Sequence, residues 1–124
     1  MIKRLLLAAV LSAGLVGPVA ADNAVPPYES ELLRLAEILG AVHYLRGLCE
    51  ADEGQTWRAL MEALIDAENP SEERRANLTA RFNRGYRGFE QSYHVCNQTA
   101  VSLIERYMEE GAGIAQQIAS RYGE

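Results

Sequence analysis

The fold is decided by one stretch of the chain, Arg81-Phe-Asn-Arg-Gly-Tyr-Arg-Gly-Phe-Glu-Gln-Ser-Tyr-His-Val-Cys96. Its large apolar side chains recur every three or four positions, a spacing that predicts an α-helix burying a single stripe. Including the preceding turn, this stripe comprises Leu78, Phe82, Tyr86, Phe89, Tyr93 and Cys96. A glycine within a helix costs about 1 kcal/mol relative to alanine. The flank that carries Gly85, Gly88 and Ser92 is therefore expected to pack closely against a neighbouring backbone.

Three more amphipathic segments accompany this helix. The apolar periodicity predicts helices over residues 29–49, 55–68, 70–96 and 99–122. Asn69 is the expected N-cap of the third helix, with Pro70 at its first position and Glu72 at capping-box spacing. Thr99 is the expected cap of the fourth. Short connections make consecutive helices antiparallel neighbours, so the sequence predicts an all-α fold, a compact antiparallel four-helix bundle.

The N-terminus has the pattern of an export signal. Lys3 and Arg4 precede an apolar run of about 12 residues, too short to span a bilayer, and Val19 and Ala21 fit cleavage after Ala21. An uncleaved N-terminal anchor is the alternative. We therefore expect a signal peptide over residues 1–21, a flexible leader over 22–28 and a helical domain over 29–124. The expected location is the periplasm, with no transmembrane span after cleavage.

The chain contains two cysteines, Cys49 and Cys96. Because exported proteins with an even number of cysteines usually pair them, we expect one disulfide between the first helix and the corner after the third. Two free thiols or two metal ligands are the alternatives.

The charge of the chain excludes one large class of partner. Its formal net charge is −5, and loss of Lys3 and Arg4 with the signal leaves ten arginines against seventeen acids. Such a chain is not expected to coat nucleic acid. The absence of lysine from the remainder has two explanations. One is genome composition, and the other is a need for bidentate recognition of carboxylate or phosphate.

Arg46 interrupts the apolar stripe of the first helix. A lone guanidinium in such a place costs several kcal/mol unless it is paired. One interpretation is a salt bridge to Glu90 or Asp66. The other is an anion-binding pocket that Arg46 forms with His43 and Tyr44.

A second candidate site lies in the third helix. Arg81, Arg84 and Arg87, with Asn83 beside them, would give an acidic protein a local positive patch. Guanidinium groups there could hold a carboxylate or phosphate of a partner. A solvated helix face with ion pairs between successive turns is the alternative.

Nothing in the sequence predicts a reaction. The chain has no nucleophile elbow, zinc-protease motif, phosphate-binding loop or haem-attachment motif, and its only histidines are His43 and His94. His43 together with Met61 or Met108 could ligate haem. Methionines that fill gaps in the core are the simpler interpretation. We therefore expect no catalytic residue, no metal ligand and no cofactor.

Three runs of residues, 35–49, 54–58 and 82–96, carry tryptophan, histidine, cysteine and paired glycines in a fixed order. In them the chain resembles a family of small exported helical proteins, mainly alphaproteobacterial, that is catalogued as a domain of unknown function. The resemblance covers about residues 32–122. It implies a periplasmic helical domain and carries over no activity, cofactor or catalytic residue.

Together these features predict a non-enzymatic interaction or adaptor module of the cell envelope. It would bind an envelope protein or an anionic polymer through its arginine and aromatic side chains. The alternative is a carrier of haem or another small ligand in the interior of the bundle.

Overall fold

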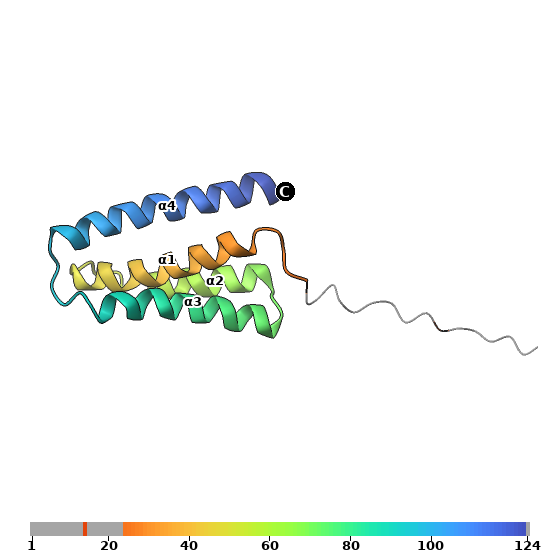
Figure 1. The fold of residues 1–124 in the computed structure, drawn as a ribbon, viewed down its shortest axis with the longest axis horizontal. Coiled ribbons are helices and arrows are strands. Elements are labelled where there is room, and N and C mark those ends of the chain that lie inside the picture. The colour runs from red at the N-terminus through yellow and green to blue at the C-terminus, as the bar shows by residue number, and fades with distance from the viewer. Residues whose placement is uncertain (1–13, 15–23, 124) are drawn as a thin grey trace, which may run out of the picture.

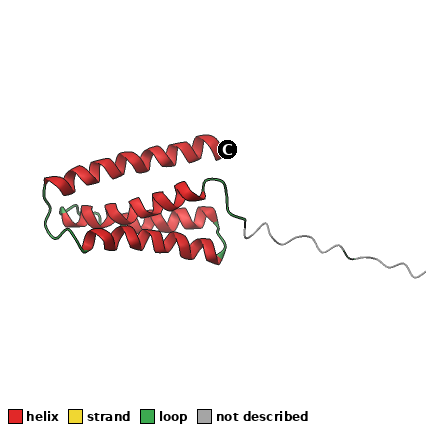
Figure 2. Ribbon diagram, viewed as in Figure 1, coloured by secondary structure: helices red, strands yellow, loops and turns green. Residues whose placement is uncertain are grey.

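The computed structural model describes residue 14 and residues 24–123. This part forms four helices and no strand: α1 (Glu29–Leu48), α2 (Thr56–Glu68), α3 (Glu72–Glu90) and α4 (Gln98–Tyr122). They run alternately in opposite directions (Figure 1), and Figure 2 shows that loops join them. The all-α four-helix bundle is thus confirmed. The expected signal peptide and its cleavage site lie outside the described residues.

The bundle is built around α1. Helices α2 and α4 pack against α1 in the antiparallel direction and α3 packs against it in the parallel direction (Figure 1). Within residues 24–123 the α4 backbone approaches that of α1 alone, and α4 meets α3 through side chains such as Tyr107 and Phe89. A helix with three neighbours must be apolar on most of its circumference. This agrees with its buried apolar residues: Leu32, Leu35, Ala36, Ile38, Ala41, Val42 and Leu45. Because the α4 backbone packs closely on α1 alone, a groove runs along each side of it.

Helices α1 and α3 approach most closely at a pair of glycines. A Cβ atom added to Gly85 would lie 2.9 Å from the carbonyl carbon of Glu37, and one added to Gly40 would lie 2.8 Å from that of Phe82. Each glycine therefore faces the backbone of the other helix. This confirms the expected packing role of Gly85. Gly88 differs, because a Cβ atom there would meet nothing within 4 Å.

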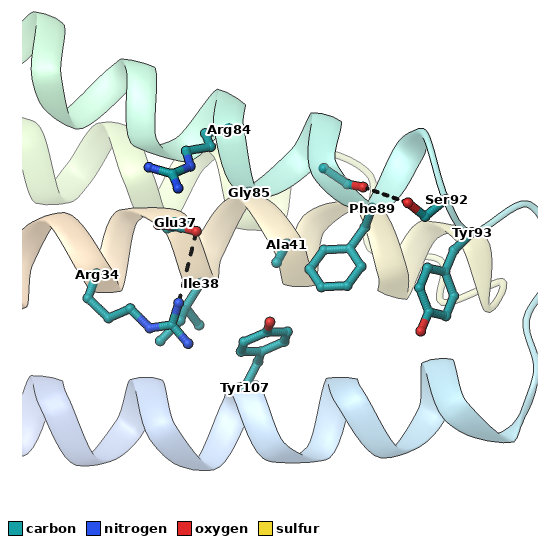
Figure 3. A pocket seen from close by; sticks show the side chains of 11 residues that line it. Arg34, Glu37, Ile38, Ala41, Arg84, Gly85, Phe89, Ser92, Tyr93 and Tyr107 are labelled. Carbon is teal, nitrogen blue, oxygen red and sulfur yellow. Dashed lines mark hydrogen bonds and ion pairs between the residues drawn. The ribbon is translucent and has the colours of Figure 1, made fainter.

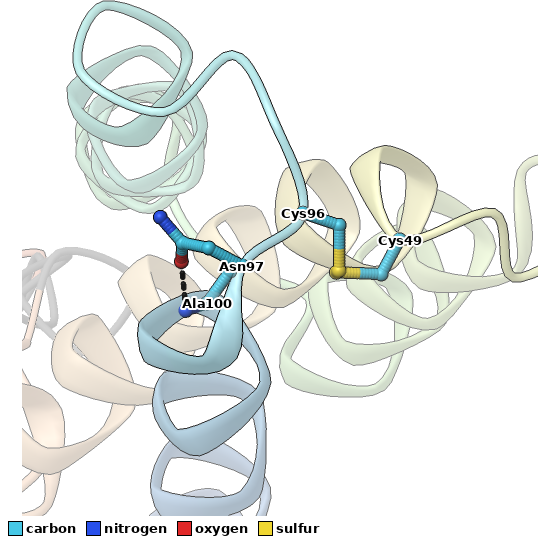
Figure 4. Close-up of a disulfide and its surroundings, with 4 residues drawn as sticks. All are labelled: Cys49, Cys96, Asn97 and Ala100. Atoms are coloured by element: carbon cyan, nitrogen blue, oxygen red, sulfur yellow. Dashed lines mark hydrogen bonds between the residues drawn. A yellow bond between two sulfur atoms is a disulfide. The ribbon is translucent and has the colours of Figure 1, made fainter.

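The helix caps differ from the sequence prediction. Asn69 does not begin α3; with φ of 43° it is the left-handed residue that ends α2. The cap of α3 is Ser71, whose hydroxyl accepts a hydrogen bond from the Arg74 amide at 3.2 Å. At α4 the cap is Asn97 rather than Thr99, and its side chain accepts from the Ala100 amide at 2.8 Å (Figure 4). In both places the residue just outside the helix supplies the acceptor.

The third helix is shorter than predicted and ends at Glu90 instead of Cys96. The carbonyl of Tyr93 accepts a hydrogen bond from the Tyr44 hydroxyl. The chain then turns so that Cys96 reaches Cys49 at the end of α1, and the two form a disulfide (Figure 4). The predicted pairing is thus confirmed. The bond ties the α3–α4 corner to the central helix.

A buried ionic cluster closes the other end of the bundle. Arg74 of α3 is only 7% exposed and donates to Glu29 at 2.7 Å and to Glu68 at 2.9 Å. The Tyr28 hydroxyl donates to Glu68 at 2.9 Å, and its ring stacks 5.2 Å from Tyr122. The hydrogen bond to Glu29 and then that to Glu68 raise the pKa of Arg74. The cluster links the start of α1 to the other three helices.

Candidate functional site

Most of the predicted binding residues meet in one groove between α1, α2 and α3. Two adjoining hollows of about 400 and 410 Å³ share His43 and Tyr86 in their lining, together with Gln55 at the start of α2. We call these two hollows the histidine groove. The first is also lined by Tyr44 and Arg46, and the second by Asn83 and Arg87. Five of the seven residues predicted to bind thus lie in a single groove.

The centre of the groove is aromatic. The His43 ring packs 5.5 Å from Tyr86 and 5.9 Å from Phe82, and Tyr44 meets Tyr86 edge-on at 5.3 Å. Burial, and after it the positive charge of Arg58, lower the pKa of His43. The imidazole is therefore held in its neutral form at neutral pH, able to donate from one nitrogen and accept at the other.

Arg46 is paired, although with an acid that the sequence did not single out. Its guanidinium donates twice to the carboxylate of Glu53, at 2.6 and 2.8 Å, in place of Glu90 or Asp66. The indole of Trp57 donates to the same carboxylate at 3.1 Å. These hydrogen bonds, that of Arg46 first, lower the pKa of Glu53. Arg46 is therefore neutralised, and the first hollow offers aromatic surface more than free charge.

The second hollow carries the free positive charge. Arg58 comes from α2 and Arg87 from α3, and neither forms an ion pair with any residue of the range 24–123. Glu90 supplies the one acid in this lining. Two unpaired guanidinium groups beside a neutral histidine can hold an anion with several charge-assisted hydrogen bonds.

The other two predicted arginines lie elsewhere. Arg81 donates to Glu37 of α1 at 3.0 Å, and Arg84 is one of the residues that line a cavity between α1, α3 and α4 (Figure 3). The three arginines of α3 therefore do not gather in one pocket, since Arg84 and Arg87 line different cavities. Arg84 and Arg87 lie on different sides of the contact with α1, because the side of α3 that carries Gly85 packs against α1.

Sequence reasoning missed Gln55, Trp57 and Arg58 as parts of this site. All three lie in the first turn of α2 or just before it, where α2 packs beside the His43 end of α1. Their placement depends on how the α1–α2 loop folds back, which no single-residue pattern reveals. The one local feature that could have indicated how the loop folds back is the bidentate pair of Arg46 with Glu53, which lies seven residues further along the chain.

The residues considered as alternative haem ligands do not converge on a common cavity. His43 lines the histidine groove, Met61 is 4% exposed in the core, and Met108 lines a separate apolar groove between α2 and α4. In the described part of the chain, no group of three or more histidine, cysteine or acidic side chains is arranged to hold a metal ion. No helix among residues 24–123 combines the length and apolar character needed to cross a membrane.

Comparisons with known proteins place the chain in a family. No curated protein and no solved structure matches it. A family model described as "Protein of unknown function (DUF2385)" matches residues 27–122, which span all four helices, the disulfide and the histidine groove. The likeness noted in the sequence therefore holds for a family without an assigned function, and the chain belongs to that family, DUF2385.

Proposed function

We propose that this protein is a non-enzymatic interaction module that recognises an anionic group, carboxylate or phosphate, in the histidine groove. The observation that carries the proposal is the pair Arg58 and Arg87, which line one hollow and form no ion pair within residues 24–123. On a chain with a net charge of −5, such a pair forms a local region of positive charge. The partner is an anionic polymer or an acidic protein of the cell envelope.

The side chains around the two arginines suit recognition better than catalysis. Asn83 and Gln55 add amide donors and acceptors, and the packed rings of Tyr86 and His43 form an aromatic surface shared by the two hollows. A rigid aromatic surface loses little conformational entropy on binding, and guanidinium groups fix the orientation of a planar anion. Within the described groove, no nucleophile is hydrogen-bonded to His43.

The compartment is part of the same proposal. The basic and apolar start of the chain supports export, and the disulfide between Cys49 and Cys96 suits an oxidising compartment. The family match supports neither a location nor a partner. We propose the periplasm, with the mature chain beginning at Asp22.

Site-specific photocrosslinking in cells tests the proposal. A photoreactive side chain at Asn83, in the groove, should give a defined adduct, whereas one at Gln116, on an exposed face of α4, should not. Arg58→Glu and Arg87→Glu should each abolish the adduct. Arg75→Glu, an equal charge change at an exposed position outside the groove, should preserve it. An adduct that persists in both groove variants would refute the proposed role of the groove.

A second candidate function rests on the apolar groove between α2 and α4. This cavity of about 350 Å³ exposes Leu60 by 47% and Met108 by 40%, and it is lined by the single tryptophan, Trp57. A carrier of a small apolar molecule would use it. Dodecanoate should then shift the emission of Trp57 to shorter wavelength in a saturable way, and Met108→Glu should remove the shift. Unchanged emission would exclude this candidate.

A further inference from the structure

A second cavity lies between α1, α3 and α4 (Figure 3). Its volume is about 320 Å³, and it shares no lining residue with the histidine groove. Phe89 reaches into it from α3 and Tyr93 from the turn after α3, and Tyr107 reaches towards them from α4 (Figure 3). Phe89 meets Tyr93 at 5.6 Å and Tyr107 at 5.7 Å, both edge-on. We call this cavity the aromatic pocket.

Two of the three arginines around the aromatic pocket form ion pairs, and the third does not. Arg34 donates to Glu110 at 2.6 Å, and Arg81 donates to Glu37 at 3.0 Å. Arg84 lines the pocket and forms no ion pair with residues 24–123. Its guanidinium is therefore the group available to a ligand carboxylate, and it matches a carboxylate bidentately.

Packing does not explain Gly88, nor does it explain Gly47 of α1 and Gly113 of α4. Gly88 lies in the last turn of α3, has no left-handed φ and would have open space around a Cβ atom, whereas Gly85 is forced by the backbone of α1. A helical glycine without either reason sacrifices up to about 1 kcal/mol of stability relative to alanine. Gly88 lines the aromatic pocket next to Phe89. A side chain at this position would extend into open space at the lining of the pocket.

We propose that the aromatic pocket binds a small molecule that joins a planar aromatic ring to a carboxylate. The ring lies against Phe89, Tyr93 and Tyr107 over Gly88, and the carboxylate pairs with Arg84. Edge-on aromatic walls favour an inserted ring, and a volume near 320 Å³ is at the small end of ligand cavities. This site is independent of the histidine groove and of the function proposed for it.

Titration of the purified, disulfide-bonded protein with 3-phenylpropionate tests this site. The amide signals of Gly85 and Gly88 in a two-dimensional NMR spectrum should shift in a saturable way. The neutral 3-phenylpropanamide, which keeps the ring, and acetate, which keeps the carboxylate, should each bind at least ten-fold more weakly. Comparison with the amide measures the contribution of the carboxylate charge, and comparison with acetate measures the contribution of the ring.

Two variants locate the ligand, and each has a matched control. Arg84→Gln should weaken 3-phenylpropionate at least ten-fold, while Arg75→Gln, on an exposed turn of α3, should leave the affinity unchanged. Gly88→Leu should fill the pocket and abolish binding. Gly113→Leu, in equally open space on α4, should not affect it. No saturable shift, or affinity that survives both Arg84→Gln and Gly88→Leu, would overturn the proposal.

Discussion

The close packing of α1 against α3 predicts opposite effects on stability for alanine at two glycines of α3, Gly85 and Gly88. Gly85→Ala places a methyl group 2.9 Å from the carbonyl carbon of Glu37 and 3.0 Å from the amide nitrogen of Ala41. Gly88→Ala places the same group in open space. The pair is well matched, because both residues lie on α3 three positions apart and both lack a left-handed φ.

The magnitude follows from the geometry. Carbon atoms pack at about 3.5–4.0 Å, so α1 and α3 must separate by roughly 1 Å to admit the methyl group at Gly85. Only backbone atoms stand in the way, so no side chain can swing aside. Overpacking of this kind costs about 1–3 kcal/mol, and alanine returns at most about 1 kcal/mol of helix propensity. We expect a net loss of about 2 kcal/mol for Gly85→Ala and a gain of up to about 1 kcal/mol for Gly88→Ala.

Urea denaturation followed by circular dichroism at 222 nm measures both values. The slope of the unfolding free energy against urea should be unchanged, so that each shift in midpoint reports stability. In a domain of this size, 1 kcal/mol corresponds to roughly 4–8 °C in melting temperature. Equal stabilisation by both alanines would refute the close crossing of α1 and α3. Equal destabilisation would show that Gly88 packs against something.

The remaining predictions concern the disulfide, the ionic cluster, the buried histidine and the export signal. Replacing both Cys49 and Cys96 by serine should lower the unfolding free energy by about 4 kcal/mol, since the bond closes a loop of 47 residues; an unchanged urea midpoint would contradict this. Arg74→Met leaves the carboxylate of Glu29 buried without a counter-charge and should cost about 3 kcal/mol in the same assay, whereas the exposed Arg75→Met should cost almost nothing. The pKa of His43 is lowered on folding from its usual 6.5, so the unfolded chain binds more protons below about pH 6.5. As the pH is lowered through that range, the wild-type unfolding free energy should therefore fall more steeply than that of His43→Gln, and parallel profiles would contradict the burial of His43. Mass spectrometry of protein recovered from the periplasm should show a chain that begins at Asp22, and an intact Met1 would favour the uncleaved anchor.

The helices were predictable because local patterns determine them. Leu32, Leu35 and Val42 recur at helical spacing, and α1 begins and ends within a residue of the expected positions. The disulfide was predictable because a chain with two cysteines and the sequence pattern of an export signal has one pairing to make. Gly85 was predictable as a packing residue because a glycine inside a helix lowers stability, and close packing against a neighbouring backbone usually accounts for it.

Other features depend on contacts that no local pattern carries. Arg74 was not singled out from the sequence, yet this residue is buried because Glu29 and Glu68 approach it from two other helices. The end of α3 depends on a hydrogen bond between Tyr44 and Tyr93, which are 49 residues apart. Asparagine is suited both to the start and to the end of a helix. Asn69 adopts the left-handed conformation that ends α2 and does not cap the start of α3.

The candidate site was predicted in part for the same reason. His43, Tyr44 and Arg46 share a helix turn, and Asn83 and Arg87 share another, so each set could be recognised from spacing. That the two sets line one groove follows from the parallel packing of α1 and α3. The split between Arg84 and Arg87 follows from the narrow crossing at Gly85, which puts them on opposite sides of the contact.

The most direct test of the proposed anion site is the pKa of His43, measured by NMR with inorganic phosphate and with chloride at the same ionic strength. The chain has two histidines, so exposed His94 serves as an internal reference. An anion held by Arg58 and Arg87 stabilises the protonated imidazole, so phosphate should raise the pKa of His43 and leave that of His94 unchanged. Arg87→Gln should reduce the rise. A His43 pKa that is the same in phosphate and chloride, or that moves only in step with His94, would contradict the account.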